Sequence, residues 1–467
     1  DAKVKDGQFS VKGNGLLDGR KTILEYDEFL SPKGKAFSSR VKAKLTADEE
    51  LRKKFGIDLS LFMSGPAGVD VTYTSKGSCN AVIDVNADLS QSLLYFEPFK
   101  YVKASGRGAQ AVLKAQMSGG ELKRVYDLNG SAPDVKISNA EIDFRGGGDE
   151  TEVSGGMLPS FTIGETRAKA EFEIGSNNRM KIIMSGPFLD MRPFLDNSET
   201  KKEAYEGPSM MMSIDVLKAR TSDTETIDAA KMYVDIDHLG KFNQLEMDAN
   251  IGAGDLYLRF KPDETGKRTF HFEADDAGAV LKAFGLYKGM RGGSMKIYAK
   301  PVRSVYDRNL VGRAEIENFR VVDAPGLARL LSAMSLSGLE QTLDGKDGLG
   351  FSRMQAEFDW LYRYNGSLLV LKNGRTSGNS LGLTFDGTFD NAKQKLDVEG
   401  TVIPLSGIND VIGSIPLLGD IITGGTGALI AATYTMKSDG PGKEPIVSVN
   451  PLSVLTPGIL RRVLFEE

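Results

Sequence analysis

The chain is poor in the residues that carry most catalytic and metal chemistry. Its 467 residues include one cysteine, two histidines and one tryptophan. Because Cys79 is alone, no disulfide forms within the chain and no cysteine spacing typical of a zinc site is present. A Ser-His-Asp or Cys-His nucleophile would have to use His238 or His271. Two histidines also exclude a histidine-rich metal site, whereas a calcium site built from carboxylates stays open.

Other enzyme signatures are weak. Thr265–Arg268 contains a Gly-Lys pair, but the first glycine of a phosphate-binding loop would fall on Lys261. With 63 acidic residues, some pair of carboxylates reaches the spacing of a glycosidase by chance. Sugar-binding sites often stack the sugar ring on an aromatic side chain, and Trp360 is the only tryptophan in the sequence. A carboxylate glycosidase is therefore not excluded, but nothing favours it. We expect a protein that is not an enzyme and has no cofactor or bound metal.

Charge and hydropathy narrow the partners. The 58 basic and 63 acidic residues give a net charge of −5, and no basic block is present, so nucleic-acid binding has no electrostatic support. No run of about 18 apolar residues occurs near the start, as a membrane-spanning helix would need. The chain begins at Asp1 without methionine. We therefore expect a processed chain, with any membrane anchor upstream of residue 1.

Glycine and alternating apolar residues are what the chain has in quantity. It contains 53 glycines and 17 prolines, and period-two alternation marks runs such as Lys21–Tyr26 and Ala81–Val85. This composition predicts a mainly β protein of many short strands and turns. The length predicts more than one compact unit, and the polar segment Asn197–Gly207 suggests a division into residues 1–200 and 208–467.

A few helices interrupt the strands. Thr46 is a suitable N-cap for a short helix that Gly56 would close. Asp276 is placed to cap a helix over Ala277–Leu286. Pro325 is suited to the first turn of another helix. The short helices are therefore expected mainly toward the C-terminal part.

Two alternating runs near the C-terminus, Leu381–Phe389 and Leu396–Pro404, predict paired strands with one apolar face. Side chains on that face are available either to lipid tails or to an ordinary core. The predicted face consists of Leu383, Phe385, Phe389, Leu396, Val398 and Val402.

Two further segments suggest contact with a membrane or a partner. Val411–Met436 is nearly uncharged and predicts a helix over Ile408–Leu418 and a strand over Leu429–Met436, which either rest on a membrane, plug a groove end or pack on the sheet. After Pro457 a terminal helix is expected. It either docks on a membrane or partner or caps the last strand. The docking residues would be Ile459, Leu460, Arg461, Arg462 and Leu464.

Several motifs together are similar to a known family. They are Ala274–Gly278, Gly285–Gly293, Val321–Leu330, Val402–Pro404, Ile408–Asn409, Ile415–Gly419, Val449–Ser453 and Pro457–Arg461. Over residues 270–465 the chain resembles the C-terminal region of large AsmA-like bacterial envelope proteins. The resemblance implies a periplasmic protein anchored in the inner membrane, whose long β-groove carries phospholipid toward the outer membrane and supports outer-membrane biogenesis.

Two functions of different classes follow. The first is lipid transfer by an elongated, twisted antiparallel sheet curled into an open apolar groove, with phospholipid acyl chains, membranes at the groove ends and envelope proteins as partners. The second is a structural or adhesive β-solenoid with a solid core and no transported ligand. The two differ in whether the inward rows of side chains are tightly packed or left open.

Overall fold

The structure is a computed structural model. It describes residues 1–77, 80–147, 151–195, 207–302, 308–333, 348–363, 366–378, 381–404, 429–430, 432–441, 443, 445–450 and 454–455. Twenty-five strands belong to one sheet, and two small sheets have two and three strands. The helices of the described chain are short: α1 (Glu49–Lys54), α2 (Arg192–Leu195), α3 (Ala277–Ala283), α4 (Pro325–Ala333) and the 3-10 turn η1 (Glu97–Phe99). The predicted mainly β class with one large sheet and few short helices is confirmed. The expected placement of these helices toward the C-terminal part is wrong for the described residues, because α1, η1 and α2 all lie before residue 200.

The chain divides into two compact units. The first is built from the described chain up to Arg220 together with Asp235–Gly240, and the second from Thr221–Val234 and from Lys241 onward. Most of the predicted boundary, residues 197–206, lies outside the described residues.

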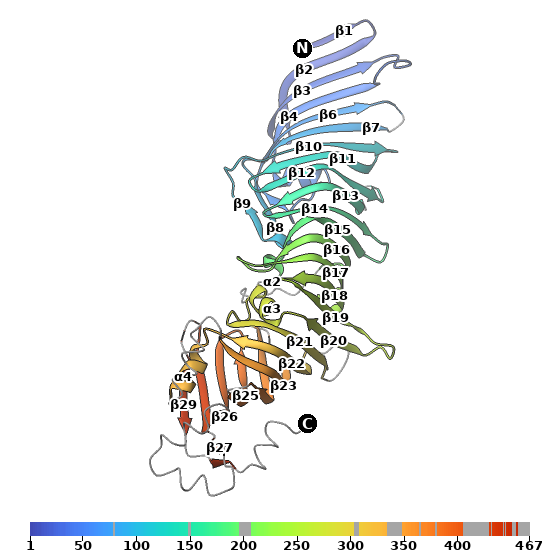
Figure 1. Cartoon of the computed structure of the whole chain (residues 1–467). Helices are drawn as coiled ribbons and strands as arrows, with labels where there is room; N and C mark the ends of the chain where they lie inside the picture. Colours follow the sequence, from blue (N-terminus) through green and yellow to red (C-terminus); the bar gives the residue numbers. More distant parts are fainter. Residues whose placement is uncertain are drawn as a thin grey trace. The chain divides into compact units, whose positions relative to one another are not determined.

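The first unit is a succession of neighbouring strands (Figure 1). Its strands in the main sheet are β1 (Ala2–Lys5), β2 (Gln8–Leu17), β3 (Arg20–Phe29), β4 (Ser39–Ala47), β6 (Ala67–Ser75), β7 (Ala81–Asp88), β10 (Gln110–Ser118), β11 (Glu121–Ala132), β12 (Val135–Arg145), β13 (Glu152–Ile163), β14 (Thr166–Ile174), β15 (Arg179–Asp190) and β16 (Ser209–Arg220). Each pairs antiparallel with the next as far as β15, and β15 then pairs with β16 in parallel.

The second unit repeats this arrangement. Its strands in the main sheet are most of β17 (Thr226–Ile236), then β18 (Phe242–Ile251), β19 (Gly254–Pro262), β20 (Arg268–Ala274), β21 (Met290–Pro301), β22 (Leu310–Val321), β23 (Leu349–Arg363), β24 (Gly366–Ser377), β25 (Leu381–Asp390), β26 (Lys395–Pro404), β28 (Ala432–Asp439) and β29 (Ile446–Asn450). From β18 to β29 neighbouring strands pair antiparallel, β26 with β28. The separate strands β27 (Leu429–Ile430) and β30 (Val454–Leu455) pair with each other.

Local chemistry explains the first hairpins. Asp6 and Gly7 have φ angles of 53° and 75°, and Asp18 and Gly19 have 48° and 80°. A two-residue type I′ loop needs positive φ at both central positions, and Asp-Gly meets that need at little steric cost. These dipeptides therefore set the β1–β2 and β2–β3 turns.

The predicted helix starts are mostly correct. Asp276 caps α3, because its carboxylate accepts a hydrogen bond from the Ala279 N–H at 2.9 Å, and Pro325 opens α4. Thr46 is not the cap of α1: it stays in β4, paired with Gly68. Asp48 caps α1 instead and accepts from the Leu51 N–H at 2.9 Å. The strand runs two residues further than the sequence pattern indicated.

A small three-stranded sheet stands beside the main sheet of the first unit. It consists of β5 (Met63–Ser64), β8 (Leu93–Phe96) and β9 (Tyr101–Lys103). The ammonium of Lys103, a residue only 3 % exposed, donates to the carbonyls of Leu89, Ser90 and Ser92 at 2.8, 3.2 and 2.7 Å. This buried ammonium therefore links β9 to the segment that follows β7.

Candidate functional site

The main sheet of the first unit has one apolar face. Leu24, Ala43, Val71, Val85 and Leu113 stand directly opposite one another across β3, β4, β6, β7 and β10. Directly paired residues project from the same side of a sheet, so these five form one continuous apolar row.

The neighbouring row on the other side is polar. Glu25, Lys42, Thr72, Asp84 and Lys114 are each one residue along from the apolar row and pair across the same strands. Because successive side chains of a strand point to opposite faces, the sheet is apolar on one side and charged on the other. Lys12 and Lys42 hold the pKa of the Glu25 carboxyl below its ordinary value.

The apolar face is covered along one edge. Ala47, Ala67 and Ala87 are buried there, 7, 3 and 9 % exposed. The guanidinium of Arg52 on α1 donates to the carbonyls of Ala47 and Gly65 at 3.1 and 2.9 Å, which holds α1 over these strand ends. Small alanine side chains permit this close approach of the covering segments.

Away from that edge the apolar face is open to solvent. Ala43, Val71, Val85 and Leu113 are all only half-buried, and Leu24 is 42 % exposed. In a sandwich or barrel, alternate side chains of this kind would be buried against a second layer. Within the described residues the middle of this face has no such layer.

The second unit has the same construction. Trp360, Leu369, Phe389 and Leu396 stand opposite one another across β23 to β26. A parallel row contains Phe358, Leu371, Gly387, Val398 and Met436. The opposite face carries charged pairs such as Asp397 and Lys437, 3.1 Å apart.

All six predicted groove residues lie on this apolar face. Leu383 pairs with Val402 and Phe389 with Leu396, while Phe385 and Val398 face Gly400 and Gly387. Five of the six are half-buried, and Val402 is completely buried at 0 % exposure.

Helix α4 covers one part of this face. A Cβ placed on Gly326 would lie 2.8 Å from the Met436 Sδ, so the α4 backbone lies against the apolar row. Arg329 Nη1 donates to the Pro445 carbonyl at 2.7 Å, and Leu330 and Leu331 are 1 and 0 % exposed. At the other end of its row Trp360 remains 41 % exposed.

Beside α3 burial is complete. Ala249, Leu256, Ala274, Met295 and Ile316 pair across β18 to β22 and are all 6 % exposed or less. Four residues further along β19, β20 and β23, the side chains of Phe260, Phe270 and Phe358 are only half-buried. Ala299, which stands in the same row, is 7 % exposed. The second unit therefore also has an apolar face that is covered along one edge and open along the other.

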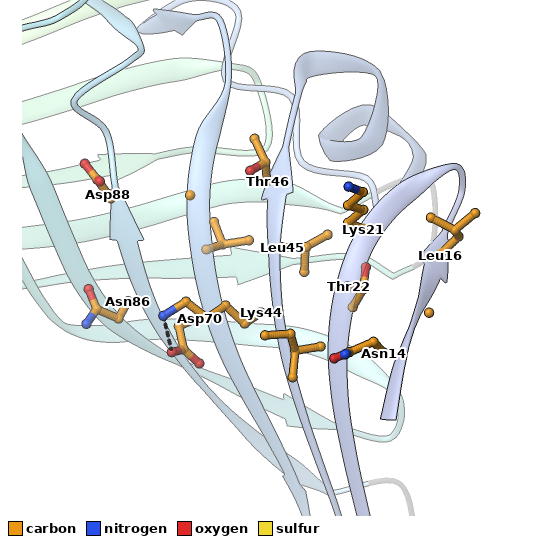
Figure 2. A pocket seen from close by; sticks show the side chains of 14 residues that line it. Asn14, Leu16, Lys21, Thr22, Lys44, Leu45, Thr46, Asp70, Asn86 and Asp88 are labelled. Atoms are coloured by element: carbon orange, nitrogen blue, oxygen red, sulfur yellow. Dashed lines mark ion pairs between the residues drawn. The ribbon is translucent and has the colours of Figure 1, made fainter. Parts of the chain in front are cut away.

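The polar face of the first unit is hollowed (Figure 2). The hollow has a volume of about 900 Å³ over β2, β3, β4, β6 and β7. Its side chains include Asn14, Thr46 and Asn86, together with the Lys44–Asp70 ion pair at 3.8 Å. Apolar residues, Leu16 and Ile23 among them, line the hollow as well, so its lining does not select for a polar ligand. No nucleophile paired with a base lies among its lining residues.

Several further features bear on metal binding and membrane contact. No cluster of three metal-ligating His, Cys, Asp or Glu side chains occurs in the part of the chain that the structure describes. None of the described helices is long and apolar enough to span a bilayer. The predicted docking residues Ile459, Leu460, Arg461, Arg462 and Leu464, and residues 405–428 with the predicted helix Ile408–Leu418, lie outside the described residues.

Sequence reasoning located the C-terminal apolar face but not the N-terminal one. The signal was present: β4 alternates Val41, Ala43, Leu45 and Ala47 with Lys42, Lys44 and Thr46. Searches against protein-family models, curated proteins and solved structures found no match to the chain. The family resemblance therefore rests on the quoted motifs alone.

Proposed function

We propose that the chain is a periplasmic bridge-like lipid transfer protein. In this proposal it carries phospholipid along a hydrophobic β-groove between the inner and outer membranes and so supports outer-membrane biogenesis. The observation that carries the proposal is the half-buried state of apolar rows in both units, such as Ala43–Val71–Val85–Leu113 and Phe358–Leu371–Gly387–Val398. Large apolar surfaces left open on a folded protein mark binding sites.

The dimensions of a single row suit an acyl chain. The row from Leu24 to Leu113 crosses five strands. At about 4.8 Å between neighbouring strands it runs roughly 19 Å. One leaflet of a bilayer has about 15 Å of hydrocarbon. An acyl chain laid along the row would remove its methylenes from water, at about 0.8 kcal/mol each, while the headgroup stays in solvent at the open edge.

Backbone irregularities support curling of the sheet around such a ligand. Asp127, Asn139, Asn318 and Asn373 lie inside strands with φ angles between 51° and 56°. The pairing shifts register beside Asp127 and Asn373. Bulges of this kind bend a strand and increase its twist. Asn and Asp tolerate the left-handed conformation better than other side chains.

The solid-core alternative fits these exposures less well. A β-solenoid interior is packed to the density of an organic crystal, so its inward side chains are buried. Burial of that kind is found beside α3, yet it does not extend to Phe260, Phe270 and Phe358. The AsmA-like resemblance over residues 270–465 favours the lipid reading as well.

Mass spectrometry of bound lipid tests the proposal. The chain is purified without detergent, and its lipids are extracted and quantified against protein. We expect phospholipid at a fixed ratio to folded protein. A folded, monodisperse preparation without phospholipid, which also takes none from vesicles, would contradict the proposal and favour the solid-core alternative.

A further inference from the structure

An uncovered apolar loop joins α1 to β5. Over residues 55–62, five large apolar side chains are exposed to solvent. They are Phe55, Ile57, Leu59, Leu61 and Phe62, at 63, 50, 37, 77 and 50 %. This segment, called the 55–62 loop below, belongs to neither of the apolar rows already described. Isolated exposed leucines are normal on a protein surface, but a contiguous set indicates a contact.

Several polar groups of the loop have hydrogen-bond partners within the protein. The Asp58 carboxylate accepts from the Ser60 N–H at 2.9 Å, and the hydroxyl of Tyr95 donates to the Ser60 carbonyl. The Phe62 N–H donates to the Leu59 carbonyl at 2.9 Å. Each of these internal hydrogen bonds lowers the cost of moving the loop from water into a lipid interface, because the bonded groups do not need water as a partner.

An aromatic base holds the loop in place. The Phe62 ring lies 6.1 Å from Phe96, which stacks on Phe99 at 5.5 Å, and Phe99 meets Phe194 edge-on at 5.5 Å. Phe194 itself is 54 % exposed. Val102 on β9, which pairs with Tyr95 on β8, is 68 % exposed. The loop thus has apolar neighbours, and Phe62 attaches its C-terminal end to them.

Size and shape favour a bilayer over a protein as the occupant. A stable protein interface uses about 20–30 residues on each side, whereas this loop has eight residues. Insertion into a lipid interface needs only a few apolar side chains. Lys53 and Lys54 precede the loop, in the last turn of α1, with their charges paired to Glu49 and Asp18 at 2.9 and 2.6 Å. Lysines beside an apolar segment suit the headgroup level of a bilayer.

We propose that the 55–62 loop inserts its apolar side chains into the interfacial region of a lipid bilayer. It thereby holds the covered edge of the first unit's apolar face at a membrane surface. The loop would give the proposed lipid transfer protein a point of contact with a membrane, and in this respect the inference rests on the proposed function. Its physical basis, the exposed apolar loop, is independent of transport.

Binding to vesicles of pure phosphatidylcholine tests the insertion. Leu61→Asp changes the most exposed side chain of the loop, and Leu217→Asp changes a 69 % exposed leucine on β16 as the matched control. We expect Leu61→Asp to bind vesicles about tenfold more weakly, because an apolar contact is replaced by a charge. The Leu217→Asp variant is expected to bind like the parent chain, and both variants to keep the parent's melting temperature.

A spectroscopic readout locates the contact. With Cys79 replaced by serine, a polarity-sensitive dye on Leu61→Cys is expected to shift its emission to shorter wavelength when vesicles are added, and a dye on Leu217→Cys is not. Equal vesicle binding by parent and Leu61→Asp, or no binding by the parent, would overturn the inference. So would a parent dimer that Leu61→Asp converts to a monomer, since the loop would then join two copies. Leu61-dependent binding by a chain that holds no extractable lipid would leave the inference standing and contradict the transfer function.

Discussion

The ring of Phe385 on β25 lies directly over Gly374 on the neighbouring strand β24. A Cβ placed on Gly374 would stand 2.2 Å from Phe385 Cε2, well inside any real contact. The register pairs the two residues directly, so the absent side chain on one strand is what lets the aromatic ring lie flat along the apolar face. The position of Phe385 on the apolar face therefore depends on the glycine at position 374.

Gly374→Ala is expected to destabilise the second unit by about 1–3 kcal/mol, because the added methyl group displaces Phe385 from its position. Gly350→Ala on β23 is the matched control, since a Cβ there meets nothing within 4 Å. Urea unfolding followed by tryptophan fluorescence of Trp360 reports on both. Equal midpoints for the two variants would show that Phe385 moves aside without cost.

Charges in the open part of the C-terminal face are expected to expel lipid without unfolding the protein. Phe385→Asp and Val398→Asp alter half-buried positions, where an introduced carboxylate still reaches solvent but opposes hydrocarbon. We expect at least a severalfold loss of co-purifying phospholipid with native circular dichroism. Val402→Asp, at a fully buried position of the same face, is expected to unfold the unit instead. Normal lipid content in folded Phe385→Asp and Val398→Asp would remove these residues from the lipid path.

Acidification is expected to weaken the start of α1 through Asp48. The Leu51 N–H and the Arg20 guanidinium lower the pKa of the Asp48 carboxyl in the folded state. Its stabilising effect is therefore complete above the unfolded value of about 3.9 and is lost as the pH falls through the lower folded value. Asp48→Asn keeps a capping oxygen but has no charge to titrate.

The measurement is the melting temperature at neutral pH and at low pH. Parent and Asp48→Asn should converge as the pH falls through the folded pKa of Asp48, and Asp48→Ala should be the least stable at neutral pH because it also lacks the cap. An unchanged difference between parent and Asp48→Asn across the whole pH range would show that the ion pair with Arg20 contributes nothing.

Loss of the Lys103 ammonium is expected to release the segment it holds. Lys103→Met leaves the carbonyls of Leu89, Ser90 and Ser92 without this donor, at a cost of about 1–3 kcal/mol. The exposed Lys76→Met serves as the control for removal of a positive charge. Limited proteolysis should cleave Lys103→Met faster than the control between β7 and β10. Identical digestion rates would mean that other contacts hold the segment.

The alternation of residues was enough to predict which side chains share a face. Leu383, Phe385, Phe389, Leu396, Val398 and Val402 lie on one side because the side-chain period of a strand is two, whatever the strand packs against. The same is true of features set by neighbours in the chain, such as the Asp276 cap of α3. Such features depend on residues close together in the chain, so the sequence is enough to predict them.

Burial along that face was settled by parts of the chain distant in sequence. Val402 is completely buried and Leu396, on the same strand and face, is half-buried. The difference depends on what covers each position, and contacts such as Gly326 on Met436 join residues more than 100 apart in the sequence. The start of α1 followed the same rule: pairing of Ala47 with Ala67 extends β4 past Thr46, so the cap passes to Asp48. Strand pairing and the covering of a sheet face arise from contacts between distant parts of the chain, so they could not be predicted from the residues of one strand.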